Sequence, residues 1–380
     1  METAVDIKDF NAGTWQDGYE YTYFLPEKIN HPFIWKDKII NELLETAALR
    51  LGELNSFSRF IPDTGMFIRM HIFKEAVVSS RIEGTRTNIE EAFIAEKDID
   101  PEKRDDWKEV NNYVKAMNSA IKELETLPLS NRLIRNTHKQ LLASARGERK
   151  GPGEFRKSQN WIGGARIADA VFVPPAHTEL PDLLTDFEKF LHNSEIGVPH
   201  LIKIAIAHYQ FETIHPFLDG NGRMGRLLIT LYFVSNSILE EPLLYLSDFF
   251  EKNKGLYYDT LTFVREKNDL TQWIKFFLTG VIETAENSAA TLQKIIHLKE
   301  KIEKEKIIIM GKRAGKGMDF LHALFTLPVV SVKGVQEITG LSPKAANDLV
   351  RLFAEHDILS EITGARRNRL FAFQEYINLF

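Results

Sequence analysis

The segment His215–Arg226 places one imidazole, one carboxylate, one amide and two guanidinium groups beside several glycines. A guanidinium can hold a phosphate through two parallel hydrogen bonds, and Mg²⁺ prefers hard oxygen ligands such as the carboxylate of Asp219. The imidazole of His215 has an unperturbed pKa of about 6.5, so it can take a proton from a hydroxyl group near neutral pH. The segment therefore predicts a site for phosphate groups and a metal ion, with a general base beside it.

The surrounding sequence predicts that this segment is a loop between two helices. Residues 200–213 are densely apolar at helical spacing and predict a buried helix, which Pro216 ends because the residue before a proline disfavours the α region. Asp219–Gly222 has the composition of a turn, and a second helix is expected from Met224 to about Ser235. A glycine-rich loop that opens a helix presents backbone N–H groups to an anion.

Arg223 and Arg226 lie on one face of the first turn of that second helix. Cations at a helix N-terminus oppose the helix dipole, at a cost of roughly a few tenths of a kcal/mol each, so the pair indicates a bound anion. No Lys-Ser or Lys-Thr pair follows the glycines, so the loop is not a P-loop. Taken singly, the histidine and the DGNG turn are more often structural, and only the complete string favours a functional site.

The complete string resembles the signature of Fic-domain proteins, HPFxDGNGRxxR. Every specified position is matched, by His215, Pro216, Phe217, Asp219, Gly220, Asn221, Gly222, Arg223 and Arg226. Proteins of that family are mainly α-helical and typically transfer AMP from ATP to a hydroxyl side chain of a target protein. The resemblance therefore implies a protein adenylyltransferase that uses ATP as co-substrate and Mg²⁺ as cofactor, and whose target could be the protein itself.

The resemblance also implies a role for each matching residue. His215 would be the catalytic base that activates the target hydroxyl, and Asp219 would hold Mg²⁺. The phosphates of the nucleotide would be bound by Gly220, Asn221, Gly222, Arg223 and Arg226, with the γ-phosphate on Arg226.

Recognition of the adenine base is less specifically encoded. Tyr257-Tyr258 resembles a pair of tyrosines that follows the signature in related enzymes, and we expect Tyr258 and Asn253 to contact the nucleotide. Two tyrosines at the start of an apolar helix are also common core residues, so that alternative stays open. Some relatives carry an asparagine about eight residues after the tyrosines, where this chain has Arg265.

A second cluster lies earlier in the chain, at the end of a helix expected from Met66 to Glu83. Gly84 follows as the residue that ends the helix, and Thr87-Asn88-Ile89-Glu90 predicts a capping box for the next one. Glu83 would occupy a last turn, where the helix dipole disfavours a carboxylate without a cationic partner. Taken alone, such a residue usually faces solvent.

The pattern of Ser79, Glu83 and Gly84 resembles the inhibitory motif of Fic proteins, Ser/Thr-x-x-x-Glu-Gly/Asn. This resemblance implies that Glu83 pairs with Arg226 and blocks productive placement of the γ-phosphate. A carboxylate and a phosphate would then compete for one guanidinium. We therefore expect the resting protein to be largely autoinhibited.

Gly151–His177 is strongly non-helical, and its paired glycines and paired prolines bracket an extended segment. This composition predicts a short β-hairpin or an extended flap, and the alternative is an ordinary surface loop. The segment is similar to the flap of Fic proteins, on which a target segment can add as an extra strand. The target would pair along Val171, Phe172 and Val173.

Composition and helical patterning predict a soluble, mainly α protein. Of 380 residues 44% are apolar and 27% charged, no cysteine is available for disulfides, and the net charge of −5 opposes electrostatic binding of the whole chain to nucleic acid. Neither a signal peptide nor a membrane span is evident, so we expect a cytoplasmic protein that does not bind membranes. Further helices are expected over about residues 36–55, 107–125, 132–145 and 270–297, after an irregular beginning.

We divide the chain into an N-terminal helical region (1–100), a Fic core (101–310), a flexible basic linker (311–317) and a C-terminal module (318–380). The module resembles a winged-helix domain, because three short helices precede two strands joined by a basic turn. Its third helix starts at Ser342, a good N-cap, with Pro343 at the first helical position. Apolar helical surface around residues 36–60 could serve a homodimer.

Three functions remain open from sequence alone. Retention of His215 favours AMP transfer, because a nucleotide sensor needs the phosphate loop but not the base. Removal of AMP by the same site, with Glu83 orienting water, is one alternative. The other is a nucleotide-sensing regulator that binds DNA through the Ser342 helix and a wing containing Arg366, Arg367 and Arg369. Because Asp348 lies between the helix cations Lys344 and Arg351, we slightly favour docking or dimerisation for this module.

Overall fold

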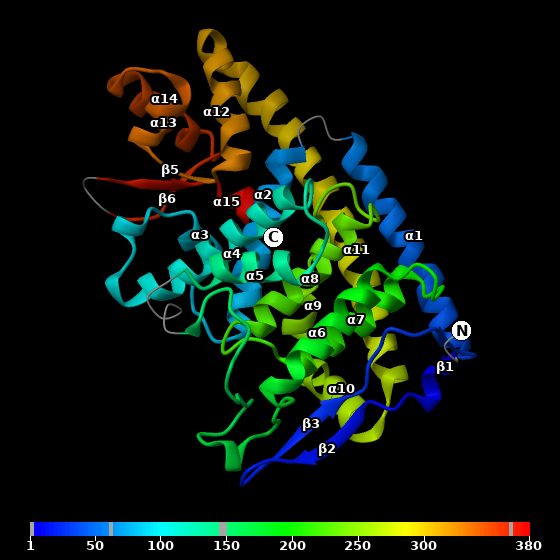
Figure 1. Cartoon of the computed structure of the whole chain (residues 1–380). Coiled ribbons are helices and arrows are strands. Elements are labelled where there is room, and N and C mark those ends of the chain that lie inside the picture. Colours follow the sequence, from blue (N-terminus) through cyan, green and yellow to red (C-terminus); the bar gives the residue numbers. More distant parts are fainter. Residues whose placement is uncertain (1–3, 61–63, 144–149, 365–367) are drawn as a thin grey trace.

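The structure is a computed structural model that describes residues 4–60, 64–143, 150–364 and 368–380, and most of these residues are helical (Figure 1). The helices are α1 (Lys38–Phe60), α2 (Thr64–Ile82), α3 (Ile89–Ala92), α4 (Arg104–Glu123), α5 (Asn131–Leu141), α6 (Leu180–His192), α7 (His200–Ile214), α8 (Asn221–Ser235), α9 (Ser247–Lys252), α10 (Lys254–Lys267), α11 (Leu270–Ile302), α12 (Ala314–Thr326), α13 (Val332–Thr339), α14 (Pro343–Glu355) and α15 (Gln374–Ile377). The strands are β1 (Val5–Asp6), β2 (Gly13–Asp17), β3 (Thr22–Pro26), β4 (Phe33–Ile34), β5 (Val329–Ser331), β6 (Ser360–Glu361) and β7 (Leu370–Ala372). The mainly α prediction is confirmed.

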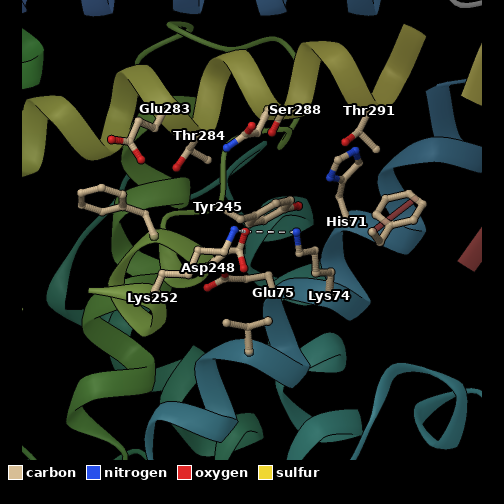
Figure 2. A pocket seen from close by; sticks show the side chains of 14 residues that line it. His71, Lys74, Glu75, Tyr245, Asp248, Lys252, Glu283, Thr284, Ser288 and Thr291 are labelled. Carbon is tan, nitrogen blue, oxygen red and sulfur yellow. Dashed lines mark hydrogen bonds and ion pairs between the residues drawn. The ribbon is translucent and has the colours of Figure 1, made fainter. Parts of the chain in front are cut away.

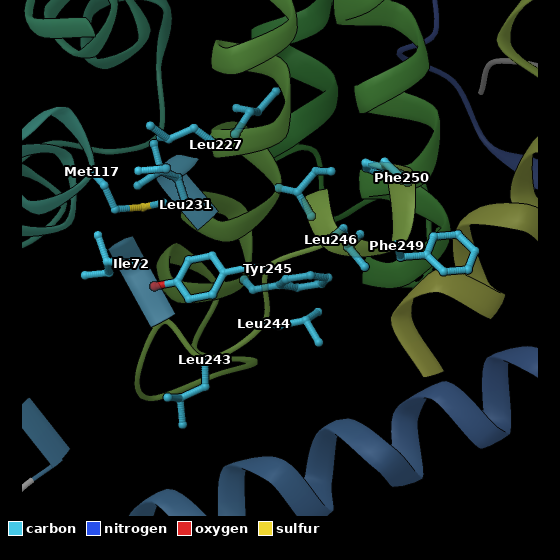
Figure 3. Packing of buried hydrophobic residues seen from close by; sticks show 14 of the residues in the cluster. Ile72, Met117, Leu227, Leu231, Leu243, Leu244, Tyr245, Leu246, Phe249 and Phe250 are labelled. Carbon is cyan, nitrogen blue, oxygen red and sulfur yellow. The ribbon is translucent and has the colours of Figure 1, made fainter. Parts of the chain in front are cut away.

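The helices on either side of the signature, α7 and α8, form the centre of the molecule. Almost every residue of α7 is buried, as expected for a helix that is apolar on all sides. Leu227 and Leu231 of α8 lie in a buried apolar cluster with Met117 of α4 (Figure 3). His208 of α7 joins three helices, because its ring nitrogens lie 3.0 Å from the carbonyl oxygen of Gly225 and 2.9 Å from the hydroxyl of Tyr257. The loop between α7 and α8 therefore starts and ends on a fixed core.

The N-terminal helix α1 packs along α11, the longest helix of the molecule. Its apolar residues Ile40, Ala47, Leu51 and Leu54 are buried. Ile39 and Leu49 remain exposed. The apolar face of residues 36–60 is thus largely used within the chain, and a homodimer through this region stays a prediction.

The irregular beginning expected for the chain contains a β-hairpin. Strands β2 and β3 pair antiparallel, from Gly13 opposite Pro26 to Asp17 opposite Thr22. Trp15 and Phe24 each lie 6.2 Å, centroid to centroid, from the ring of Phe172 in the flap. The sequence indicated aromatic residues here but not their pairing, because the partner that stabilises the hairpin lies in a distant segment.

Residues 311–317, predicted to be a flexible linker, are helical on both sides of a break at Gly311. The chain continues from α11 through π and 3₁₀ turns to Arg313 and then directly into α12, with a non-helical break at Gly311. Met310 and Ile307 pack close to Gly317, so local contacts hold the segment in place despite its glycines. The domain boundaries themselves stay predictions.

The C-terminal module contains α12–α15 and a three-stranded antiparallel sheet in the order β5-β7-β6. Ser342 caps α14 as expected, while Arg366 and Arg367 lie outside the described residues. Helix α12 packs on α2, and Gln374 donates a hydrogen bond to Glu90 across 3.2 Å. The winged-helix assignment stays a prediction.

The capping box of α3 uses Asn88 and Glu91, not Thr87 and Glu90, so that prediction was one residue early.

Within the described ranges, the structure has no helix that is both long and apolar enough to cross a membrane.

Candidate active site

The signature forms the predicted loop between two helices, and two residues of it adopt left-handed backbone conformations. His215 ends α7 with φ 48° and ψ 60°, and Gly220 precedes α8 with φ 76°. A left-handed histidine is disfavoured and requires support from its surroundings. Helix α8 begins at Asn221, three residues before the expected start at Met224, so the glycines belong to its first turn.

Asn221 closes the loop on itself. Its Oδ1 accepts a hydrogen bond from the backbone N–H of Phe217, and its Nδ2 donates to the carbonyl of the same residue, both across 2.8 Å. Both ends of this buried amide are therefore engaged in the loop. A contact of Asn221 with a phosphate stays a prediction. Because the side-chain amide is already bonded within the loop, the backbone N–H of Asn221 is the group that could make this contact.

Two residues that the sequence did not single out for this purpose hold the backbone around His215. Arg156 donates from Nε to the carbonyl of His215 across 3.0 Å, and its own N–H bonds the carbonyl of Pro216 across 2.9 Å. Asn160 donates to the carbonyls of His215 and Phe217, across 3.3 and 2.8 Å. These bonds supply the support that the left-handed histidine requires.

A second histidine, His138 of α5, supports the loop from the other side. Its ring stacks on Phe217 with a centroid distance of 3.6 Å and an interplanar angle of 8°. Nδ1 accepts the N–H of Gly153 across 2.9 Å, so the proton is on Nε2, which donates to the carbonyl of Asp219 across 2.9 Å. Burial lowers the pKa of His138 to about 4, which keeps this arrangement neutral. A lone histidine in an amphipathic helix gave no sequence signal for this role.

The imidazole of His215 is neutral at physiological pH. Burial lowers its pKa to about 4, outweighing the opposing effect of the Glu212 carbonyl, which lies 3.4 Å from Nδ1. A neutral imidazole has a free lone pair and can accept a proton. The protonation state therefore fits the predicted role of a general base.

Asp219 presents the accessible carboxylate of the loop, with 45% of its side chain exposed. Its Oδ1 accepts the N–H of Gly220 across 2.6 Å and lies 3.8 Å from Arg223 Nη2. Among the described residues, no group of three or more His, Cys, Asp or Glu side chains could hold a metal ion. One exposed carboxylate suits Mg²⁺, which commonly binds one or two carboxylates and completes its shell with water and substrate phosphates.

Arg223 is buried and paired. Its side chain is 5% exposed, and Nη1 donates to Glu109 of α4 across 2.9 Å. This ion pair fixes α8 against α4. A direct contact of Arg223 with a nucleotide stays a prediction.

Arg226 lies against the predicted inhibitory residues. Its Nε donates to the hydroxyl of Ser79 across 2.8 Å, and its Nη2 donates to the carbonyl of Ser79 and to Glu83 Oε1, across 2.9 and 2.7 Å. The arginine side chain is 2% exposed and that of Glu83 is 37% exposed. Burial tends to raise the pKa of the Glu83 carboxyl, but Arg226 holds it below its usual value, so Glu83 is ionised.

The Glu83 carboxylate also covers the N-terminus of α8. A Cβ built on Gly222 would overlap Glu83 Oε1 and would lie 3.0 Å from Arg226 Nη1. Gly84 has φ 104°, a conformation that favours glycine after the end of α2. Ser79 and Glu83 are distant from the phosphate loop in the sequence, but the fold brings them to Arg226 and the start of α8, where an anion would bind.

A cavity of about 330 Å³ lies between the flap, strand β2, the end of α7 and α10. Tyr258 lines it, whereas the buried Tyr257 belongs to the core. Asn253 is not among its lining residues and instead donates to the carbonyl of Phe249 across 2.9 Å. The guanidinium of Arg265 also lines the cavity and lies 4.0 Å from the centroid of the Phe172 ring.

Glu212 lies between this cavity and the phosphate loop. Its carboxylate lines the cavity, and a Cβ built on Gly225 of α8 would overlap its Oε1. That oxygen is buried and has no hydrogen-bond partner among the described residues. Burial raises the pKa of Glu212 to about 7, against the opposing charge of Arg226.

Of the two forms predicted for the flap, a short β-hairpin or an extended segment, the structure has the extended one. A single bridge joins Ile162 and Phe172, and a 3₁₀ turn occupies Ile167–Asp169 between them. Phe172 and Val173 are buried, whereas Val171 is 79% exposed. Two paired glycines and few strand residues give too little pairing for a longer ladder.

Comparisons with known proteins agree with this geometry. Residues 41–122 match the Fic/DOC family N-terminal domain, and residues 128–233 match the Fic/DOC family. The protein adenylyltransferase Fic of Aedes aegypti is 34% identical over 125 residues, which cover 33% of this chain and 22% of that protein. Its counterpart in Drosophila erecta is 41% identical over 78 residues, covering 20% of this chain and 14% of that protein. The matches thus span less than a quarter of these relatives' length.

Two solved structures share the fold. A Fic family protein from Desulfovibrio desulfuricans G20 aligns over 91% of this chain and 98% of its own, with a TM-score of 0.57 and 19% identity. A Fic domain containing signaling protein from Bacteroides thetaiotaomicron aligns over 68% of this chain and 97% of its own, with a TM-score of 0.51 and 16% identity.

Proposed function

This chain belongs to the Fic/DOC family, and we propose that it transfers AMP from ATP to a hydroxyl side chain of a target protein. The observation that carries the proposal is the neutral imidazole of His215 fixed beside the N-terminus of α8, where backbone N–H groups and Arg226 face an anion site. The names of the curated relatives agree with this activity.

In the proposed reaction the target hydroxyl gives its proton to His215 while its oxygen attacks the α-phosphorus of ATP. The new P–O bond forms as the bond to the β-phosphate breaks, and pyrophosphate leaves. The N-terminus of α8 and Arg226 offset the charge of the phosphates. Mg²⁺, when bound at Asp219, would neutralise further phosphate charge.

The order of groups in a nucleotide fits the order of groups along the site. With phosphates on the α8 loop and the base in the 330 Å³ cavity beside Tyr258, the ribose falls at Glu212, which touches both. Because Oε1 of Glu212 is buried against Gly225, the other carboxylate oxygen is the one that remains to accept hydrogen bonds from ribose hydroxyls. We assign Glu212 this role.

The contacts of Arg226 support the proposal that the protein is autoinhibited. Ser79 and Glu83 take its Nε and Nη2, and Glu83 lies over Gly222, so the γ-phosphate and Glu83 compete for the same space and charge. Movement of Glu83 would free the site. The flap would receive the target along Val171, whose side chain is exposed beside the cavity.

The test is mass spectrometry of the Glu83→Gly protein incubated with Mg²⁺ and a mixture of nucleotides. We expect an AMP adduct on the protein or on added target, formed about tenfold or more faster than by wild type, since a hydrogen bond to a charged group contributes about 1.5–3 kcal/mol and Glu83 is partly exposed. Glu102→Gly, a matched change at an exposed residue of another segment, should behave as wild type. Equal rates for Glu83→Gly and wild type would contradict autoinhibition.

Removal of AMP is a second candidate, because the partly exposed Glu83 carboxylate could orient a water molecule over the α8 N-terminus. A pre-modified protein separates the two. Release of AMP by wild type, lost in Glu83→Gly, would favour removal. DNA binding finds less support, since Arg351 on α14 already pairs with Asp348 and Glu355.

A further inference from the structure

A second cavity, with about 60 Å³ of space, lies between α2, α9 and α11, away from the loop that carries His215 (Figure 2). A water molecule needs about 10–15 Å³ by this kind of measure, so the space suits several waters or one solute of a few heavy atoms. This second cavity shares no lining residue with the 330 Å³ cavity beside Tyr258, which we call the nucleotide cavity.

Three buried polar atoms of this second cavity lack a hydrogen-bond partner in the part of the chain that the structure describes. They are His71 Nε2, Glu75 Oε2 and the hydroxyl of Tyr245, on residues that are 6%, 3% and 7% exposed. A buried polar group left unpaired costs about 1–3 kcal/mol. Three such groups around one space indicate a ligand with both donors and acceptors.

Charges of both signs surround the cavity. Lys74 and Lys252 both bind the same oxygen of Asp248, Oδ2, across 3.3 and 2.9 Å. Because each ammonium group has three N–H donors, both lysines keep donors that this oxygen does not use. Glu283 projects from α11 on the side opposite the two lysines (Figure 2) and, with Glu75 Oε2, offers acceptors. The carboxylates would repel a simple anion, and the ammonium groups would repel a simple cation. A ligand that carries one charge of each sign therefore fits the cavity better.

Hydroxyl groups complete the wall formed by α11. Thr284, Ser288 and Thr291 line the cavity at helical spacing, and Figure 2 shows their side chains on the α11 side. Hydroxyls can donate to a carboxylate or accept from an ammonium group. The small space leaves room for little beyond those two charged groups.

The same cavity is built on the helix that carries the inhibitory glutamate. Glu75, Ser79 and Glu83 follow one another at four-residue spacing on one face of α2 and its end. Glu75 Oε1 accepts the hydroxyls of Ser247 and Tyr113, across 2.5 and 2.9 Å. The cavity wall and the contact with Arg226 therefore depend on the same placement of α2.

We propose that this cavity binds a small zwitterion, a free amino acid of the size of glycine or serine, and that the bound molecule strengthens inhibition by Glu83. The lysines would take its carboxylate, and Glu75 and Glu283 its ammonium group. Because α2, α9 and α11 all contribute to the wall, the ligand binds best when α2 is docked, which is the state in which Glu83 holds Arg226. This regulatory part rests on the proposed function.

Binding is tested by isothermal titration of the full chain with glycine and L-serine, alongside glycerol and inorganic phosphate. We expect an amino acid to bind and the other two probes not to. Ser288→Phe, which fills the cavity, should weaken binding at least tenfold. Thr291→Val, which removes one hydroxyl without changing volume, should weaken binding severalfold. Ala290→Phe, a comparable addition on an exposed position of α11, should not. No binding of either amino acid, or equal binding of glycerol or phosphate, would overturn the assignment.

Coupling is tested by nucleotidyl transfer with and without the amino acid that binds. Wild-type transfer should slow severalfold, whereas Glu83→Gly should bind the amino acid but keep its rate. Binding without any effect on the wild-type rate would overturn the coupling. If Glu83→Gly transfers nothing, the proposed function fails, and the titration still decides whether the cavity is a site.

Discussion

The loop that carries His215 and the flap beside it are held in opposite ways. Carbonyls of the loop accept hydrogen bonds from Arg156, Asn160 and His138, and Asn221 closes the loop with two more. The flap is closed by one bridge and leaves Val171 exposed. The difference indicates that the chemistry depends on a locked backbone, while the edge proposed to receive the target stays able to adapt.

The largest effect should come from the base itself. We expect His215→Ala in the Glu83→Gly background to lower the rate of AMP transfer by about 10²–10⁴-fold, the usual contribution of a general base. Single-turnover assays with labelled ATP measure the rate, and nucleotide titration checks that ATP still binds. Retention of transfer within a few-fold would break the assignment of chemistry to the loop.

The pH dependence of transfer should reflect the buried environment of His215. Burial lowers its pKa to about 4, so the neutral base persists well below pH 6.5. Glu212, with a pKa of about 7, becomes protonated in the same range, so the assay uses saturating ATP to offset any loss of nucleotide affinity. Under that condition the rate of Glu83→Gly should stay level from pH 7 towards 5.5 and fall as the pH approaches 4. Because folded-state pKa values of His215 and His138 lie below the unfolded value, stability also declines as pH falls below about 6.5, and circular dichroism must accompany the assay. A rate that halves near pH 6.5 while the protein stays folded would contradict a neutral, buried base.

Glu212 extends the comparison from the loop into the nucleotide cavity. In the Glu83→Gly background, Glu212→Gln should reduce discrimination between ATP and 2′- or 3′-deoxy-ATP, by roughly 10-fold to 100-fold, the range for a hydrogen bond to a charged group. The ratio of kcat/KM values for the two nucleotides is the readout. An equal loss for ATP and its deoxy analogues would assign Glu212 to Arg226 instead of the ribose.

The sequence predicted the parts of this site that lie in short strings of residues. The loop between two helices follows from the turn residues of His215–Arg226, and Gly84 follows from the pattern that ends a helix. The approach of Glu83 to Arg226 was implied only by the resemblance to the inhibitory motif of Fic proteins. The residues that support the loop could not be predicted in this way. His138 acts through stacking on Phe217 and two backbone contacts, and such contacts leave no pattern in a sequence.

Composition also misled where tertiary contacts decide structure. The glycines and basic residues at 311–317 indicated a flexible linker, but the segment is helical on both sides of a break at Gly311. The flap has the turn residues of a hairpin, and it pairs at one bridge while Phe172 packs on Trp15 and Phe24. The contacts of residues 311–317 are local, whereas those of the flap come from a segment distant in sequence.

Loosening the loop should have a smaller effect than removing the base. We expect Asn160→Ala to lower transfer by Glu83→Gly about 5-fold to 10-fold, because it removes hydrogen bonds to the carbonyls of His215 and Phe217 worth about 0.5–1.5 kcal/mol each. Lys157→Ala, on an exposed position of the same segment, is the matched control. If both variants transfer equally, the locked backbone is not what positions the base.

The smallest effect is expected at the flap. Val171→Ala removes exposed apolar surface that a target would cover, so KM for the target protein should rise about 2-fold to 5-fold while kcat stays unchanged. Because Val171 also lines the nucleotide cavity, KM for ATP should rise by less than KM for the target. Phe172→Ala, in contrast, empties a buried position beside Arg265 and should alter ATP binding and stability together. Steady-state assays with target and ATP varied in turn separate the two. If Val171→Ala changes kcat instead, the flap is part of the fixed catalytic frame, and the contrast between the two regions fails.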